Sequence, residues 1–215
     1  MRTLWVLLAF MYFPFGGMTQ INYIEHNKAV EKLNLAKELM AQESYAEAIQ
    51  HLKSAVELDS SMRASYMLIY EAGYVSGNTQ VARDYLEKAK TIFLGDDEVI
   101  YYLAKVYQKE KNYLAALGEF TLAIKYSKVN GEDLPIIYDY YASRGVCYLK
   151  QNKYQQALDD FNDALKLNEM EGSIYVNRGY ALYKLEQPDA GCKSWQKAFD
   201  LGHTYVQKYL DKFCK

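Results

Sequence analysis

A small residue recurs in this sequence at a nearly constant spacing, and this recurrence constrains the fold more than any other feature. The recurring small residues, separated by 34, 34, 41 and 34 positions, are Ala48, Ala82, Ala116, Ala157 and Gly191. Four positions after each one stands a large apolar residue: Leu52, Leu86, Phe120, Phe161 and Trp195. Seven positions after each one stands an alanine: Ala55, Ala89, Ala123, Ala164 and Ala198. Because positions i, i+4 and i+7 share one face of an α-helix, the spacing predicts five helices with a small–large–small face.

Each of these helices has a companion earlier in its repeat. Twelve positions before the small residue lies a second recurring site, occupied by Ala36, Tyr70, Ala104, Gly145 and Gly179. A period of about 34 residues has room for two helices and a tight turn. The predicted unit is therefore a helical hairpin, which cannot bury its apolar face alone and must stack on the next copy.

This pattern resembles the tetratricopeptide repeat. The clearest copy joins residues 141–148 to Tyr154, Ala157, Phe161 and Ala164. The resemblance implies an all-α, right-handed superhelical solenoid of about five helix–turn–helix units with a C-terminal capping helix. Two departures stand out: no unit ends with the usual proline, and Tyr70 replaces the small residue of the second unit.

The repeat frame divides the chain into segments. We expect a signal peptide at 1–19, a lead-in at 20–28, units one to three at 29–130, an insert at 131–137, units four and five at 138–205, and a capping helix at 206–215. Pro188 is expected to begin the last second helix, where its missing N–H costs nothing.

The expected signal peptide depends on an apolar run of 12 residues, 4–15, that follows Arg2. A bilayer-spanning helix needs about 20 apolar residues, whereas a secretory leader needs fewer. Cleavage is expected between Thr19 and Gln20. We therefore expect an exported bacterial protein, periplasmic or envelope-associated, with no stable membrane span after leader removal. An uncleaved anchor and a buried first helix remain the alternatives.

Charge and motif content exclude several functions. Lys plus Arg (25) nearly balances Asp plus Glu (27), for a net charge of −2, so a nucleic-acid partner is not expected. The three histidines lack metal-ligand spacing, and no phosphate-binding loop, nucleophile elbow or HExxH motif occurs. We expect neither an enzyme nor a bound cofactor.

The resemblance also implies that the first helices line a concave surface, which is rich in tyrosine here. Candidate partner-binding residues on it are Tyr74, Tyr101, Tyr102, Lys105, Asn177, Tyr180 and Tyr183. The family's carboxylate clamp is not expected, because Val146 stands where an asparagine is required. The expected function is an adaptor or scaffold that binds a protein or peptide partner within an envelope complex. The alternative is an envelope glycan- or peptidoglycan-binding protein.

Several other residues carry narrower expectations. Cys192 and Cys214 should approach each other, either as a disulfide or as two reduced thiols, if the cap folds back over the last hairpin. Arg144 and Arg178 are expected to pair with carboxylates among Asp159, Asp160 and Asp163, with anion binding as the alternative. Residues 96–98, Asp-Asp-Glu, are expected to form a solvated helix start.

Overall fold

The computed structural model describes residues 23–131 and 135–214. These residues form α-helices joined by short turns, together with one 3-10 segment, and contain no strand. The first helices of the five hairpins are α1 (Tyr23–Ala41), α3 (Arg63–Ser76), α5 (Asp97–Lys109), α7 (Ile137–Lys150) and α9 (Gly172–Lys184). The second helices are α2 (Tyr45–Leu58), α4 (Thr79–Ile92), α6 (Tyr113–Asn130), α8 (Tyr154–Leu167) and α10 (Pro188–Asp200). The all-α prediction is confirmed, whereas the expected signal peptide lies outside the described residues.

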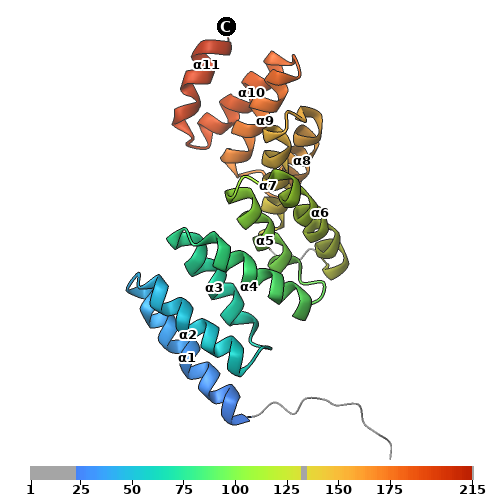
Figure 1. Cartoon of the computed structure of the whole chain (residues 1–215). Coiled ribbons are helices and arrows are strands. Elements are labelled where there is room, and N and C mark those ends of the chain that lie inside the picture. Colours follow the sequence, from blue (N-terminus) through green and yellow to red (C-terminus); the bar gives the residue numbers. More distant parts are fainter. Residues whose placement is uncertain (1–22, 132–134, 215) are drawn as a thin grey trace, which may run out of the picture.

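The five hairpins stack in chain order to form a curved solenoid (Figure 1). Each second helix packs on the first helix of its own hairpin; α2, α4, α6 and α8 also pack on the first helix of the next hairpin, whereas α10 packs on the C-terminal segment. The first helices α3, α5, α7 and α9 also contact one another from repeat to repeat. Since elements on the inside of a curved stack lie closest together, these contacts place the first helices on the inner side.

The recurring small–large–small face forms the core. All fifteen residues of this pattern are buried, as the sequence predicted. The small residues of the first helices are needed because large rings lie against them. A Cβ atom at Gly145 would lie 2.7 Å from Cε1 of Phe161, and one at Gly179 would lie 2.5 Å from Nε1 of Trp195. Close packing of this kind explains why glycine is accepted in the middle of α7 and α9 despite its helix-breaking cost.

The turn inside each hairpin contains one residue with a left-handed backbone. These residues, with φ between 58° and 82°, are Glu43, Gly77, Lys111, Asn152 and Glu186. Each precedes the recurring small residue by five positions, so the turns repeat with the same spacing as the helices. The turn geometry is thus shared by all five units although only one of them uses glycine.

The N-terminal end differs from the expected lead-in. Helix α1 begins at Tyr23, so residues 23–28 extend the first helix beyond the start expected at residue 29. The ring of His26 contacts the carboxylate of Asp59, with 2.6 Å between Nδ1 and Oδ2. This contact ties the start of α1 to the loop that follows α2.

A short cap covers the C-terminal end. After α10, which begins at Pro188 as predicted, the chain forms a 3-10 turn (Thr204–Val206) and α11 (Gln207–Phe213). The ring of Trp195 lies 5.2 Å from that of Tyr209 and 5.8 Å from that of Phe213. A disulfide joins Cys192 of α10 to Cys214, directly after α11. The aromatic rings and the disulfide together hold the cap against the last hairpin.

No described helix combines the length and apolar character that crossing a bilayer requires.

Candidate partner-binding face

The inner face, formed by the exposed sides of α3, α5, α7 and α9, contains two pockets. The N-terminal pocket lies between α3 and α5, has a volume of about 410 Å³, and is lined by Arg63, Met67, Leu68, Tyr70, Glu71, Glu98 and Tyr102. The C-terminal pocket lies between α7 and α9, has a volume of about 370 Å³, and is lined by Val146, Leu149, Lys150, Asn152, Asn177 and Tyr180. Both pockets combine apolar side chains with charged or amide groups, which is typical of ligand-binding sites.

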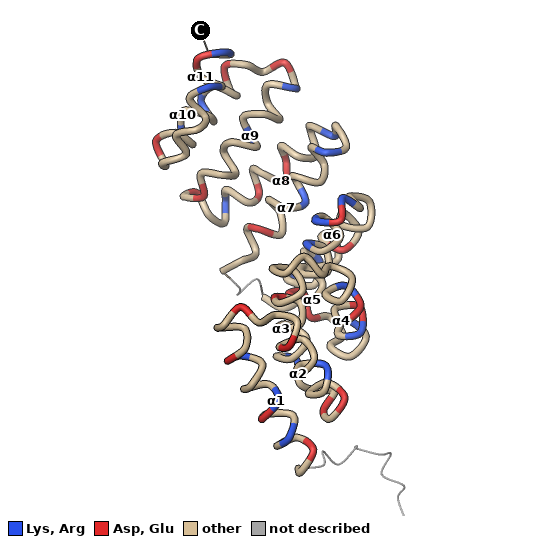
Figure 2. Tube along the Cα trace, turned by 60° about the vertical axis from the view of Figure 1, so that its left-hand side comes forward, with Lys and Arg blue, Asp and Glu red and all other residues tan. Residues whose placement is uncertain are grey.

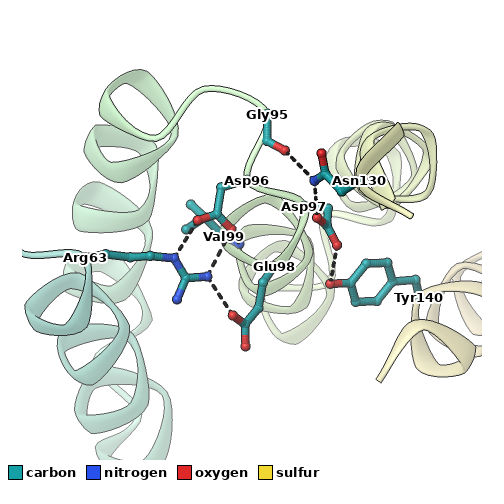
Figure 3. A network of polar contacts seen from close by, with 8 residues as sticks. All are labelled: Arg63, Gly95, Asp96, Asp97, Glu98, Val99, Asn130 and Tyr140. Carbon is teal, nitrogen blue, oxygen red and sulfur yellow. Dashed lines mark hydrogen bonds and ion pairs between the residues drawn. The ribbon is translucent and has the colours of Figure 1, made fainter. Parts of the chain in front are cut away.

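One wall of the N-terminal pocket is held by an ion-pair network at the start of α5 (Figure 3). Arg63 of α3 donates from Nε and Nη2 to the carboxylate of Asp96, at 2.5 and 3.0 Å. Its Nη2 also donates to Glu98, at 2.6 Å. The hydrogen bond to Asp96 is the main cause that raises the pKa of Arg63, so this guanidinium stays charged. Asp96 also accepts the backbone N–H of Val99 and thereby caps α5.

The neighbouring carboxylate, Asp97, points away from the pocket and into the stack (Figure 3). It is only 6% exposed. It accepts hydrogen bonds from Asn130 Nδ2 at 2.6 Å and from the Tyr140 hydroxyl at 3.0 Å. Burial raises the pKa of Tyr140, and the Asp97 carboxylate raises it further. The expected helix start at residues 96–98 is confirmed, but the expectation that it is solvated was wrong, because these carboxylates connect the second, third and fourth hairpins.

Tyrosine rings form a row across α3, α5 and α7. Ring centroids lie 4.5 Å apart for Tyr70 and Tyr102, 5.0 Å for Tyr102 and Tyr101, and 4.4 Å for Tyr101 and Tyr140. Tyr102 lines the N-terminal pocket, but Tyr101 is 2% exposed and donates its hydroxyl to Asp139. Burial raises the pKa of Tyr101. The expectation that Tyr101 offers a contact surface was wrong, since its ring fills the space between α5 and α7.

Two other predicted contact residues also have partners within the chain. Lys105 Nζ donates to Asp139 at 3.4 Å and to the Ser143 hydroxyl at 3.3 Å, which joins α5 to α7. The ring of Tyr183 lies 4.4 Å from that of Phe213, so it helps to seat the cap. Lys105 therefore connects two repeats and Tyr183 connects the last hairpin to the cap, although both side chains stay partly exposed.

The remaining predicted residues do lie on the inner face. Asn177 and Tyr180 line the C-terminal pocket, and Tyr180 is 41% exposed. The Asn177 amide donates to the backbone oxygen of Ser173 on its own helix, at 3.2 Å. The ring of Tyr74 is half-buried and is covered by Lys109 Nζ, 3.9 Å from its centroid.

Sequence reasoning did not single out the Tyr70 ring or the Glu98 carboxylate as parts of a site. Tyr70 was visible only as a departure from the small-residue pattern. The available signal was steric, since a large ring at a position that is small in other repeats must find space outside the hairpin core. It does so by packing on Tyr102 of the next repeat.

The expected arginine pairs have different outcomes. Arg144 donates to both oxygens of Asp160, at 2.9 and 2.7 Å, as predicted. Burial nevertheless raises the pKa of Asp160. Arg178 donates instead to Asn162 Oδ1 and the Ser194 hydroxyl, so the expected carboxylate partner was wrong. Within residues 23–131 and 135–214, no group of His, Cys, Asp and Glu has the arrangement of a metal site.

Charges of both signs occur along the whole described length of the solenoid (Figure 2). Neither sign dominates any large region, in line with the near-zero net charge. Local charge within the two pockets, and not an overall field, must therefore decide what this face attracts.

Comparison with protein families gives two matches to models described as the tetratricopeptide repeat, at residues 33–97 and 138–170. The chain contains tetratricopeptide repeats. The first match covers most of the first two hairpins and the second covers the fourth, which contains the clearest sequence copy.

Curated relatives with such similarity are larger proteins. The chain is 26% identical over 197 residues to Hsp70-Hsp90 organizing protein 2 of Arabidopsis thaliana, covering 89% of this chain and 32% of that protein. It is 27% identical over 170 residues to the Hsp70-Hsp90 organizing protein of Triticum aestivum, covering 78% and 28%. The chain thus spans about a third of the length of these relatives.

Solved tetratricopeptide-repeat structures share the fold. YrrB, described as a TPR protein with an unusual peptide-binding site, superposes with a TM-score of 0.69 at 22% identity, covering 88% of this chain and 95% of that one. MamA superposes with a TM-score of 0.71 at 15% identity, covering 88% and 97%. At these identities the similarity shows the solenoid architecture alone.

Proposed function

We propose that this chain is a non-catalytic scaffold whose inner face binds a segment of a partner protein or a peptide. The observation that carries the proposal is the presence of two pockets on one face, lined from α3 and α5 and from α7 and α9. An extended segment that follows this face would pass both pockets. Relatives named as organizing proteins and a peptide-binding structural neighbour support a binding role.

We further propose that the protein is exported and acts in a bacterial cell envelope, within an envelope complex. The support is the apolar leader-like run at residues 4–15 together with the disulfide between Cys192 and Cys214. Disulfides persist in oxidising compartments and are rare in the reducing cytosol. N-terminal sequencing of the protein purified from its source should find Gln20 as the first residue. An intact N-terminus on cytosolic protein would contradict export.

The binding proposal is tested by affinity capture with matched variants. The inner-face variant combines Tyr102→Ala with Tyr180→Ala, because both rings line pockets and neither is fully buried. The control is Leu114→Ala, which removes a 76% exposed side chain from the outer helix α6. Circular dichroism checks that all three proteins are folded.

Wild type and the control should recover the same partner, and the inner-face variant should recover much less of it. Equal recovery by all three would remove the inner face from the proposal. Peptidoglycan fragments added as competitors test the glycan-binding alternative, since they should leave capture of a protein partner unchanged.

A further inference from the structure

Two tyrosine rings form an aromatic wall of the N-terminal pocket. Tyr70 from α3 and Tyr102 from α5 place their ring centroids 4.5 Å apart, with Met67 and Leu68 beside them. Aromatic ring faces carry partial negative charge and attract cations. A wall of this kind favours a ligand that has an apolar stem and a cationic end.

The protein itself places cations on other tyrosines of this face. Lys109 Nζ lies 3.9 Å from the ring centroid of Tyr74, and Lys105 Nζ lies 5.7 Å from that of Tyr101. Within residues 23–131 and 135–214, no lysine or arginine makes such a contact with Tyr70 or Tyr102. The two rings pack on each other and on Tyr74 and Tyr101, but both also line the pocket, and their pocket-facing parts carry no cation from the described residues.

The pocket also has more negative than positive charge. Arg63 is shared between Asp96 and Glu98, so one guanidinium faces two carboxylates. A third carboxylate, Glu71, is exposed at the pocket and makes no hydrogen bond or ion pair in the part of the chain that the structure describes. Burial raises the pKa of Tyr102, and the nearby Glu98 carboxylate raises it further.

We infer that the N-terminal pocket binds the side chain of an arginine or lysine from the partner segment. This inference rests on the proposed function. The aliphatic stem packs along Met67 and Leu68, the cationic end lies against the rings of Tyr70 and Tyr102, and Glu71 supplies the counter-charge. An acidic side chain would meet only carboxylates and an arginine that is already paired.

The test is selection of a random peptide library on the immobilised full chain. Peptides selected by wild type should carry lysine or arginine at one shared position, and this preference should be clearly weaker among those selected by Glu71→Gln. Glu47→Gln is the matched control, because Glu47 is an exposed glutamate of the outer helix α2. It should select the same peptides as wild type. Folding is not at risk in either variant, since both glutamates are exposed.

The best selected peptide is then synthesised with its basic residue and with glutamine in that place. Fluorescence anisotropy should show binding to wild type about tenfold weaker for the glutamine peptide, which corresponds to the loss of one cation–π contact and one ion pair. In Glu71→Gln the same change should have a smaller effect, because the two groups interact directly.

The outcomes separate the two proposals. Selected peptides without a shared basic residue, or with a shared acidic one, would overturn this inference and leave the proposed function standing. It would also be overturned if the losses in binding free energy from the peptide change and from Glu71→Gln were additive. A library that yields no binding peptide at all would remove the proposed function and this inference together.

Discussion

Replacing Asp97 with alanine should loosen the junction between the third and fourth hairpins. Its carboxylate accepts one hydrogen bond from Asn130 at the end of α6 and one from Tyr140 in α7. A hydrogen bond to a charged group contributes about 1.5–3 kcal/mol, less where the donor is exposed. Asn130 is exposed, whereas Tyr140 is fully buried and would keep an unpaired hydroxyl. We expect a loss of about 3 kcal/mol in the free energy of unfolding.

A double-mutant cycle separates this interaction from general damage. Tyr140→Phe should cost about 1 kcal/mol, because Asp97 keeps its hydrogen bond from Asn130. The double variant should lose about 1 kcal/mol less than the sum of the two single losses, since both remove the same hydrogen bond. Urea unfolding followed by circular dichroism measures the three losses.

Amide hydrogen exchange locates the effect along the chain. Solenoids are stabilised by contacts between neighbouring repeats. The amide exchange rates of Asp97→Ala should therefore rise above those of wild type more in α5, α6 and α7 than in α1 and α2. A loss below about 1 kcal/mol for Asp97→Ala, or single losses that add, would refute the assignment of Asp97 as the link between these repeats.

Three further predictions concern packing, the cap and pH. Gly179→Ala should lower stability by about 1–3 kcal/mol, because the new Cβ atom would lie 2.5 Å from Nε1 of Trp195. Gly118→Ala, in open space on α6, should raise stability by about 1 kcal/mol. Thermal unfolding compares the two variants, and equal shifts in their Tm values would contradict the packing argument. Reduction of the C-terminal disulfide should lower stability by about 3 kcal/mol in the chain-entropy estimate, and an unchanged urea midpoint in dithiothreitol would contradict it. Burial alone would raise the pKa of Asp96, but its hydrogen bonds, chiefly from Arg63, lower it. The ionised Asp96 therefore stabilises the folded state at pH values above its unfolded-state pKa of about 3.9. This stabilisation is lost as the pH falls through the lower pKa of the folded state. Asp96→Asn should therefore be less stable than wild type at pH 7, and the gap should narrow at acidic pH. A stability difference between Asp96→Asn and wild type that does not change with pH would contradict a link between Asp96 ionisation and folding.

The repeat architecture could be predicted from the sequence because it depends on local spacing. Positions i, i+4 and i+7 face the same side of a helix whatever the rest of the chain does. The tolerance of proline at the first position of a helix located the helix start at Pro188, and a cap was expected from residue 206, where Val206 is buried and Phe213 packs on Trp195. A hairpin with one apolar face has to stack, so five copies determine a solenoid.

The hairpin turns were only partly visible in the sequence. The residues with a left-handed backbone recur with the period of the repeat. In three turns they are Glu43, Lys111 and Glu186, and the sequence does not indicate their conformation, because glutamate and lysine rarely adopt it. Their conformation follows from the two helices that each turn must join.

Only the tertiary structure decided which inner-face residues are available to a partner. Tyr101 and Tyr102 are adjacent in sequence, yet Tyr101 is buried and donates its hydroxyl to Asp139, whereas Tyr102 lines the N-terminal pocket. Neighbouring residues on a helix point about 100° apart, so the angle at which one hairpin rests on the next decides which ring is covered. Asn130 and Tyr140, which donate hydrogen bonds to Asp97, lie 33 and 43 residues away, and the bond from Tyr140 forms only after the third and fourth hairpins have stacked. Spacing along the chain therefore determines the architecture, whereas contacts between repeats determine the surface.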